Sequence, residues 1–197
     1  MEIYYEETSF VQDDKQAAKK YNLYKTLSII CFVFAGIWIF YTFNGGVKFV
    51  DEYIIEAVLI TFIPMTACTS LGGFFWHIKN RYYVDYDYCF SSGEMIVSKI
   101  YKNAKRVGLV RFNAMHVFQM GRVDSETYDS IISQPGVEVM KATFNNSPSE
   151  GCDFFYIAVT CAAKKKVIIL DCTEKMIATV LKFSSKLVME KGFKWSI

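Results

Sequence analysis

Two histidines, His77 and His116, are the only side chains of a type that titrates near neutral pH in this 197-residue sequence. His77 follows Trp76 at the end of an apolar stretch, and His116 stands among the alternating apolar residues of a predicted strand. Neither has a neighbourhood like that of a catalytic triad. The sequence also lacks HExxH, GxSxG and a glycine-rich phosphate loop. We therefore expect interfacial or packing roles for both histidines and no enzymatic activity.

Three acidic residues are candidates for chemistry because of their positions. Asp85 and Asp87 are two residues apart in a predicted strand, so they lie side by side on one face, which we expect to be exposed to solvent. Glu56 stands near the start of an apolar stretch, where an acid is costly and often functional. Its closeness to a loop favours solvation by headgroup water, and a role in ion coupling is the alternative.

The six cysteines suggest no metal centre and no redox dithiol, because no pair has CxxC spacing. Two of them, Cys31 and Cys68, lie in apolar stretches, and the others are scattered along the second half of the chain. We expect small buried side chains kept reduced in the cytoplasm. The sequence therefore predicts no cofactor.

Basic residues gather around the first predicted turns of the second half, and they are the best candidates for contact with a lipid headgroup or a partner. They are Lys99, Lys102, Lys105, Arg106 and Arg111. Near an anionic membrane leaflet, each basic side chain contributes about 1 kcal/mol of attraction. Ordinary solvation of lysines at hairpin ends is the alternative. The net charge of only +2 argues against a nucleic-acid binder, which needs a much larger basic excess.

Two long apolar stretches lie in the first part of the chain, whose overall hydrophobic content is 52%. They cover about residues 23–43 and 53–78, and each exceeds the roughly 20 residues that cross a bilayer. The loop between them is too short to hold a domain. Residues 22–79 are therefore predicted to form a transmembrane helical hairpin in a multi-pass protein of the cell membrane.

Lysine and arginine positions predict the orientation of this hairpin. Lys15, Lys19, Lys20 and Lys25 lie before or at the start of the first stretch, Lys79 and Arg81 follow the second, and the connecting loop holds a single lysine. The positive-inside rule then places both termini in the cytoplasm. Residues 1–21 are predicted to be a cytoplasmic tail, and residues 80–197 a cytosolic domain.

The second half alternates apolar and polar residues, and turn signals interrupt it about every ten residues, as is typical of an antiparallel β domain. Strands are predicted at residues 82–90, 94–101, 106–112, 115–120, 137–144, 153–161 and 166–171. Thr173 then begins an amphipathic C-terminal helix. The predicted fold is an α+β membrane protein: a two-helix hairpin followed by a seven-stranded antiparallel barrel of pleckstrin-homology (PH)-like type, capped by the helix.

Three segments carry a resemblance to a known family. They are YDYCFSSGEMIVSKI at residues 86–100, Lys105-Arg106 before a strand, and DCTEKM at residues 171–176. The chain resembles a family of uncharacterised bacterial membrane proteins, mainly Gram-positive, with a PH-like cytosolic domain of unknown function. The resemblance implies this fold, but no activity, ligand or site residue comes with it.

Together these observations predict a non-enzymatic binding or scaffold protein that presents a PH-like domain at the inner leaflet. Its expected partners are the membrane itself, another membrane or cytosolic protein, and anionic lipid headgroups. An accessory subunit of a membrane transport or channel complex is the alternative, in which Glu56 would be functional.

Overall fold

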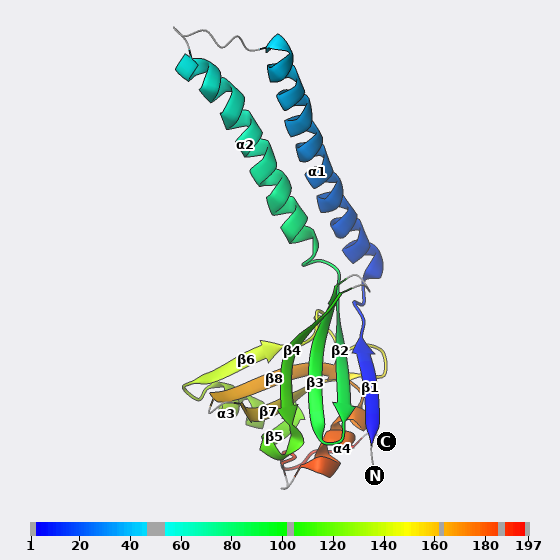
Figure 1. Ribbon diagram of the computed structural model, residues 1–197. Coiled ribbons are helices and arrows are strands. Elements are labelled where there is room, and N and C mark those ends of the chain that lie inside the picture. The colour runs from blue at the N-terminus through cyan, green and yellow to red at the C-terminus, as the bar shows by residue number, and fades with distance from the viewer. Residues whose placement is uncertain (1–2, 47–53, 102–104, 162–163, 185–187, 196–197) are drawn as a thin grey trace. The chain divides into compact units, whose positions relative to one another are not determined.

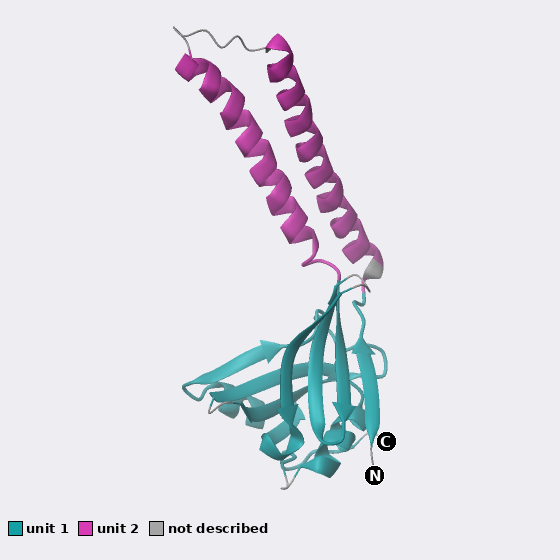
Figure 2. Cartoon of the chain, in the orientation of Figure 1, with its two compact units in different colours: residues 1–12, 84–197 teal, residues 13–83 magenta. Residues whose placement is uncertain are grey.

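A computed structural model describes residues 3–46, 54–101, 105–161, 164–184 and 188–195. The chain forms two compact units (Figure 2). Unit 1 comprises residues 1–12 and 84–197, and unit 2 comprises residues 13–83. Unit 2 therefore stands, in sequence, between two parts of unit 1.

Unit 2 consists of two long antiparallel helices, α1 (Asp14–Tyr41) and α2 (Ile54–Lys79) (Figure 1). The chain enters α1 from β1 and leaves α2 towards β2. The side chain of Asp13 caps α1 by accepting a hydrogen bond from the Gln16 N–H, 3.0 Å away. Both helices are long and apolar enough to cross a membrane, and most of their apolar surface is exposed. The two apolar helices of the prediction are confirmed, although α1 begins well before residue 23.

Close packing joins the two helices. The Ser28 hydroxyl donates a hydrogen bond to the Gly72 carbonyl oxygen, 2.7 Å away. A Cβ atom at Gly72 would lie 3.0 Å from the Phe32 ring, so the absence of a side chain permits this approach. Towards the ends of the hairpin that continue into unit 1, the Tyr24 and Tyr82 rings stack with centroids 5.0 Å apart. Lys79 is buried there and its ammonium group lies over the rings of Trp76 and Tyr21.

Unit 1 is built from two four-stranded sheets. The first has the order β1 (Tyr4–Ser9), β2 (Val84–Ser91), β3 (Glu94–Tyr101), β4 (Lys105–Asn113), and all its neighbours are antiparallel. The second has the order β5 (Val117–Arg122), β7 (Asp153–Cys161), β8 (Lys164–Cys172), β6 (Val137–Lys141). Short helices α3 (Glu126–Ile132) and η3 (Ala114–His116) connect strands, and α4 (Glu174–Phe183) follows β8.

This architecture corrects the predicted seven-stranded antiparallel barrel. The described residues form eight strands in two sheets that do not close into one barrel, and β6 runs parallel to β8. The additional strand, β1, lies in the segment predicted to be a tail, and residues 14–21 of that segment belong to α1. A six-residue strand with two glutamates gives little hydrophobic signal, and its partner β2 is far away in sequence.

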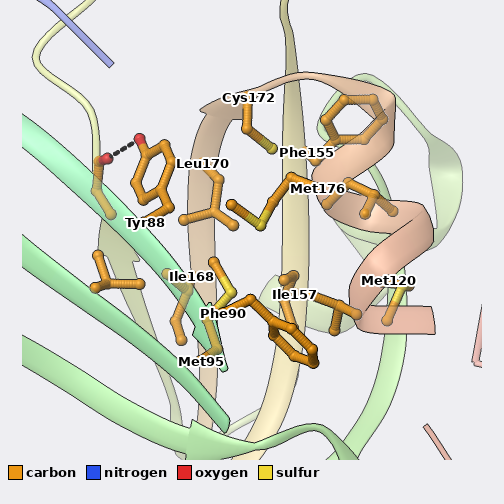
Figure 3. Packing of buried hydrophobic residues seen from close by; sticks show 14 of the residues in the cluster. Tyr88, Phe90, Met95, Met120, Phe155, Ile157, Ile168, Leu170, Cys172 and Met176 are labelled. Atoms are coloured by element: carbon orange, nitrogen blue, oxygen red, sulfur yellow. Dashed lines mark hydrogen bonds between the residues drawn. The ribbon is translucent and has the colours of Figure 1, made fainter. Parts of the chain in front are cut away.

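The β2–β3 hairpin agrees with the prediction. Ser92 and Gly93 both have positive φ, 49° and 90°, which is the conformation of a two-residue type I′ turn. Glycine adopts this conformation without steric cost. The inward face of β2 is buried, as its alternation predicts, and includes Tyr88 and Phe90 at 0% exposure. Figure 3 shows these rings packed with Phe155, Leu170 and Met176, so the core is shared by both sheets and α4.

The chain after α4 returns to the free side of β5. The Met120 N–H donates to the Val188 carbonyl oxygen (2.7 Å), and the Glu190 N–H donates to the Met120 carbonyl oxygen (2.9 Å). The Glu190 carboxylate then accepts from the Arg122 N–H at 3.0 Å. A Cβ atom at Gly121 would lie 2.2 Å from the Glu190 carboxyl carbon, so only glycine permits this arrangement.

Gly121→Ala is therefore expected to displace Glu190 and to lower the free energy of unfolding by about 1–3 kcal/mol. Thermal unfolding of the full chain and limited proteolysis near Lys191 measure the effect. Gly108→Ala is the matched control, because a Cβ atom there meets nothing within 4 Å. Equal unfolding temperatures for the two variants would contradict the prediction.

Candidate functional site

The five basic residues singled out in the sequence do not form one patch. Arg106 pairs with Asp87 (2.9 Å) and Glu6 (3.3 Å), so its charge is engaged within the first sheet. Lys99 lies on the opposite face of that sheet, over the Tyr86 ring. Arg111 binds Glu94 at the other end of β4 from exposed Lys105. Lys102 lies outside the described residues.

Asp85 and Asp87 are buried, which corrects the expectation of an exposed face. Their exposed fractions are 2% and 1%. The Asp85 carboxylate accepts a hydrogen bond from the Val11 N–H (3.1 Å), and Asp87 pairs with Arg106 and accepts from the Thr8 hydroxyl. Burial raises the pKa of Asp87, and the Arg106 guanidinium opposes this rise. The chain preceding α1, absent from the predicted fold, covers these carboxylates.

Glu56 and both histidines are exposed, and Glu56 and His77 lie at opposite ends of α2. Glu56 lies in the first turn of α2, where the helix dipole favours a negative charge. His77 lies in the last turn of the same helix. His116 ends η3 and lines an open cavity of about 770 Å³ together with Cys161 and Arg111. Among the described residues, no three His, Cys, Asp or Glu side chains gather as metal ligands would.

A buried polar cluster of unit 1 is centred on Asp171, near the end of β8. One of its carboxylate oxygens accepts hydrogen bonds from the Ser9 hydroxyl (3.0 Å), the Asn145 amide (2.8 Å) and the Ser149 hydroxyl (2.6 Å). The other oxygen accepts from the Ser149 N–H at 3.0 Å. Asp171 is 1% exposed, so these four donors replace the water that the charge has lost. They come from two segments, at residue 9 and at residues 145–149, that are distant from each other in sequence.

Further hydrogen bonds extend this cluster. The Tyr88 hydroxyl donates to the Ala142 carbonyl oxygen, drawn as a dashed line in Figure 3, and accepts from the Asp171 N–H. Burial raises the pKa of Tyr88 well above its ordinary range, so the phenol keeps the proton that it donates. Asn145 also donates to the Phe10 carbonyl oxygen and accepts from the Gln12 N–H. The cluster therefore joins both sheets to the residues that lead into α1.

A second contact ties β1 to the start of α4. The Glu7 carboxylate accepts from the Thr173 N–H (2.7 Å) and from the Thr173 hydroxyl (3.0 Å). Thr173 occupies the N-cap position, as predicted, but its hydroxyl is directed to Glu7 instead of to the helix. Beside this contact lies a cavity of about 590 Å³ whose lining includes Arg122, Cys152 and Lys175. Arg122 pairs there with Asp153 and Glu174, so the cavity wall carries balanced charges.

Cys152 in this cavity is expected to be a poor nucleophile. Burial and the adjacent Glu7 carboxylate raise the pKa of its thiol to about 12. At pH 8, alkylation of Cys152 in the folded chain should be roughly tenfold to a hundredfold slower than in the chain unfolded by urea. Residue-resolved mass spectrometry after timed iodoacetamide treatment measures both rates. Glu7→Gln should lower the pKa and accelerate the reaction, and equal rates in folded and unfolded chains would refute the assignment.

Glu7, Asn145 and Asp171 were not singled out in the sequence analysis. Each is a polar residue in a segment that looks like solvated tail, loop or strand end. The one available signal is that Asp171 follows the continuous apolar run of residues 167–170, which places an acid at the end of a buried strand. In this arrangement the donors and acceptors satisfy one another, so the cluster acts as a structural junction.

Comparison with known proteins yields one match. A family model described as Bacterial PH-like domain (DUF6106) matches residues 1–190, which include β1, both apolar helices and nearly all of the remaining domain. No curated protein and no solved structure matches the chain.

Proposed function

Because the chain belongs to this family of bacterial PH-like domains, we propose that it is a membrane-anchored, non-enzymatic binding or scaffold protein. Its PH-like domain would recruit a protein or sense lipid at the inner leaflet of the cell membrane. The observation that carries the proposal is the position of the apolar hairpin, between β1 and β2 of one domain. A domain assembled from both sides of an anchor is held at the membrane by two chain connections.

Charge supports the proposed orientation. Lys15, Lys19, Lys20, Lys79 and Arg81 lie near the helix ends that continue into unit 1. The positive-inside rule then puts unit 1 and both termini in the cytoplasm. Tyr24, Trp76 and Tyr82 lie near the same helix ends and are of the type that accumulates at membrane interfaces.

Crosslinking of the full chain in native membranes, followed by identification of the adducts, tests the binding role. Reproducible protein adducts that disappear in Tyr88→Ala, which disrupts unit 1, would support recruitment by the domain. An experiment that recovers only adducts shared with an unrelated membrane protein would remove the proposal's support.

Glu56→Gln is the matched variant for the alternative, an accessory subunit of a transport or channel complex. Glu56 is exposed on α2, outside unit 1, so its substitution leaves the PH-like domain unchanged. Adducts that survive Tyr88→Ala but disappear in Glu56→Gln would favour the alternative over the recruiting domain.

A further inference from the structure

Two phenylalanine side chains are exposed at the end of unit 1 from which the chain continues into α1. Phe10 is 63% exposed and Phe144 is 44% exposed. They lie on adjacent segments, because the Asn145 amide donates to the Phe10 carbonyl oxygen at 2.9 Å. Exposed apolar side chains on adjacent segments are candidates for a site of interaction. We call the surface formed by residues 10–12 and 144–148 the exit face.

Several hydrogen bonds join the two segments of the exit face. The Gln12 N–H donates to the Asn145 side chain (3.0 Å), and the Gln12 amide donates to the carbonyl oxygens of Ser147 (2.8 Å) and Pro148 (2.7 Å). Beneath these residues, Ser9 and Thr143 are buried and their hydroxyls contact one another. The residues that carry the two phenyl rings are therefore flanked by buried polar side chains.

The connections to unit 2 determine what the exit face can meet. Gln12 lies two residues before α1, and the five Cα–Cα steps from Lys79 at the end of α2 to Val84 reach at most about 18 Å. Arg81 and Tyr82 donate hydrogen bonds back to Ile78 and Lys79, which shortens this connection further. Val84 also lies at this end of the sheet, since Ser9 pairs with Tyr86 (Figure 1).

We propose that the exit face docks on the lipid surface of the membrane, with Phe10 and Phe144 in the interfacial region. Lys105, exposed at the same end of the first sheet, would contact anionic headgroups. The inference rests on the proposed anchoring of the hairpin. Aromatic rings partition favourably into the interface between headgroups and acyl chains. Docking fixes which end of the PH-like domain is directed away from the membrane: the end that carries η3 and the cavity lined by His116.

Site-specific photocrosslinking tests the contact. The photoreactive amino acid p-benzoylphenylalanine replaces residue 10, 144 or 115 in the full chain, which is then reconstituted in nanodiscs of phosphatidylglycerol and phosphatidylethanolamine. Met115 is the matched control, because it is 59% exposed but lies in η3, next to the β2–β3 turn at the other end of the sheet. Mass spectrometry should find lipid adducts at positions 10 and 144 at least about fivefold more often than at position 115.

Two results would overturn the docking: equal lipid labelling at all three positions, or labelling at positions 10 and 144 by protein in native membranes. Extraction with alkaline carbonate separates this failure from that of the anchor. A chain that remains in the membrane but gives no lipid adduct at positions 10 and 144 refutes docking alone. A chain that carbonate extracts refutes the proposed anchoring and the docking together.

Discussion

Deletion of residues 1–12 is expected to leave unit 1 unable to hold its native fold. The deletion removes β1, the six residue pairs that it forms with β2, and the hydrogen bond that the Val11 N–H donates to the Asp85 carboxylate. It also removes the Ser9 donor to Asp171 and the Glu7 acceptor of Thr173. Buried polar groups without partners cost about 1–3 kcal/mol each, so the total should exceed about 5 kcal/mol, a large part of an ordinary domain's stability.

Pulse proteolysis of the full chain and of the deletion variant, both in the same detergent, measures this loss. Removal of residues 1–2 alone is the control, because β1 begins at Tyr4. A synthetic peptide of residues 1–12 should restore protection in trans, since it supplies the missing strand. Equal protease resistance of the deletion variant and the full chain would show that β1 is dispensable. The same reasoning predicts that residues 80–197 do not fold as an isolated domain.

Asp171→Ala is expected to lower the free energy of unfolding by about 3–5 kcal/mol, because it leaves several buried donors without an acceptor. The Ser9 and Ser149 hydroxyls, the Asn145 amide and the Ser149 N–H all lose their acceptor. Asp171→Asn should recover only part of the loss. An amide retains one acceptor oxygen, but its NH₂ group faces donors.

Denaturant or thermal unfolding of unit 1 in the full chain, followed by near-ultraviolet circular dichroism, reports this change. Asp124→Ala provides the control, since Asp124 is exposed and also lies outside the core. If Asp171→Ala unfolded at the same midpoint as Asp124→Ala, the hydrogen bonds to Asp171 would contribute little to stability. Hydrogen exchange at the N–H groups of Ser149 and Gln12 should increase in Asp171→Ala, which localises the effect to the junction.

Local patterns determine much of unit 1, which is why the sequence predicts several of its elements well. The alternation along β2, the Ser92-Gly93 turn and the strand over residues 94–101 agree with the structure. The helix after Thr173 agrees as well. In each case the signal and the element lie within about ten residues of one another, so no distant partner is needed to recognise them.

Non-local pairing explains what the sequence analysis missed. β1 is stabilised by β2 and by buried acids, none of which is near it in sequence. For the same reason, Asp85 and Asp87 look in the sequence like the solvated face of an edge strand. In the structure, the chain at and after β1 covers Asp85, and Arg106 covers Asp87. β6 looks like an antiparallel neighbour of β7, but β8 lies between them; β8 runs antiparallel to β7 and parallel to β6. The junction at Asp171 depends on all of these long-range contacts and could not be predicted before them.

The order of synthesis gives the position of β1 a further consequence. A ribosome releases β1 first and its partner β2 only after both long helices have been made. Loop closure over so many residues would oppose the pairing of β1 with β2. The pairing of α1 with α2 removes much of this cost, because contacts such as Ser28 with Gly72 and Tyr24 with Tyr82 bring the two ends of unit 2 together. A newly made chain whose helices fail to pair bears the full loop-closure cost, and we expect its β2 edge to be left uncovered and open to proteases.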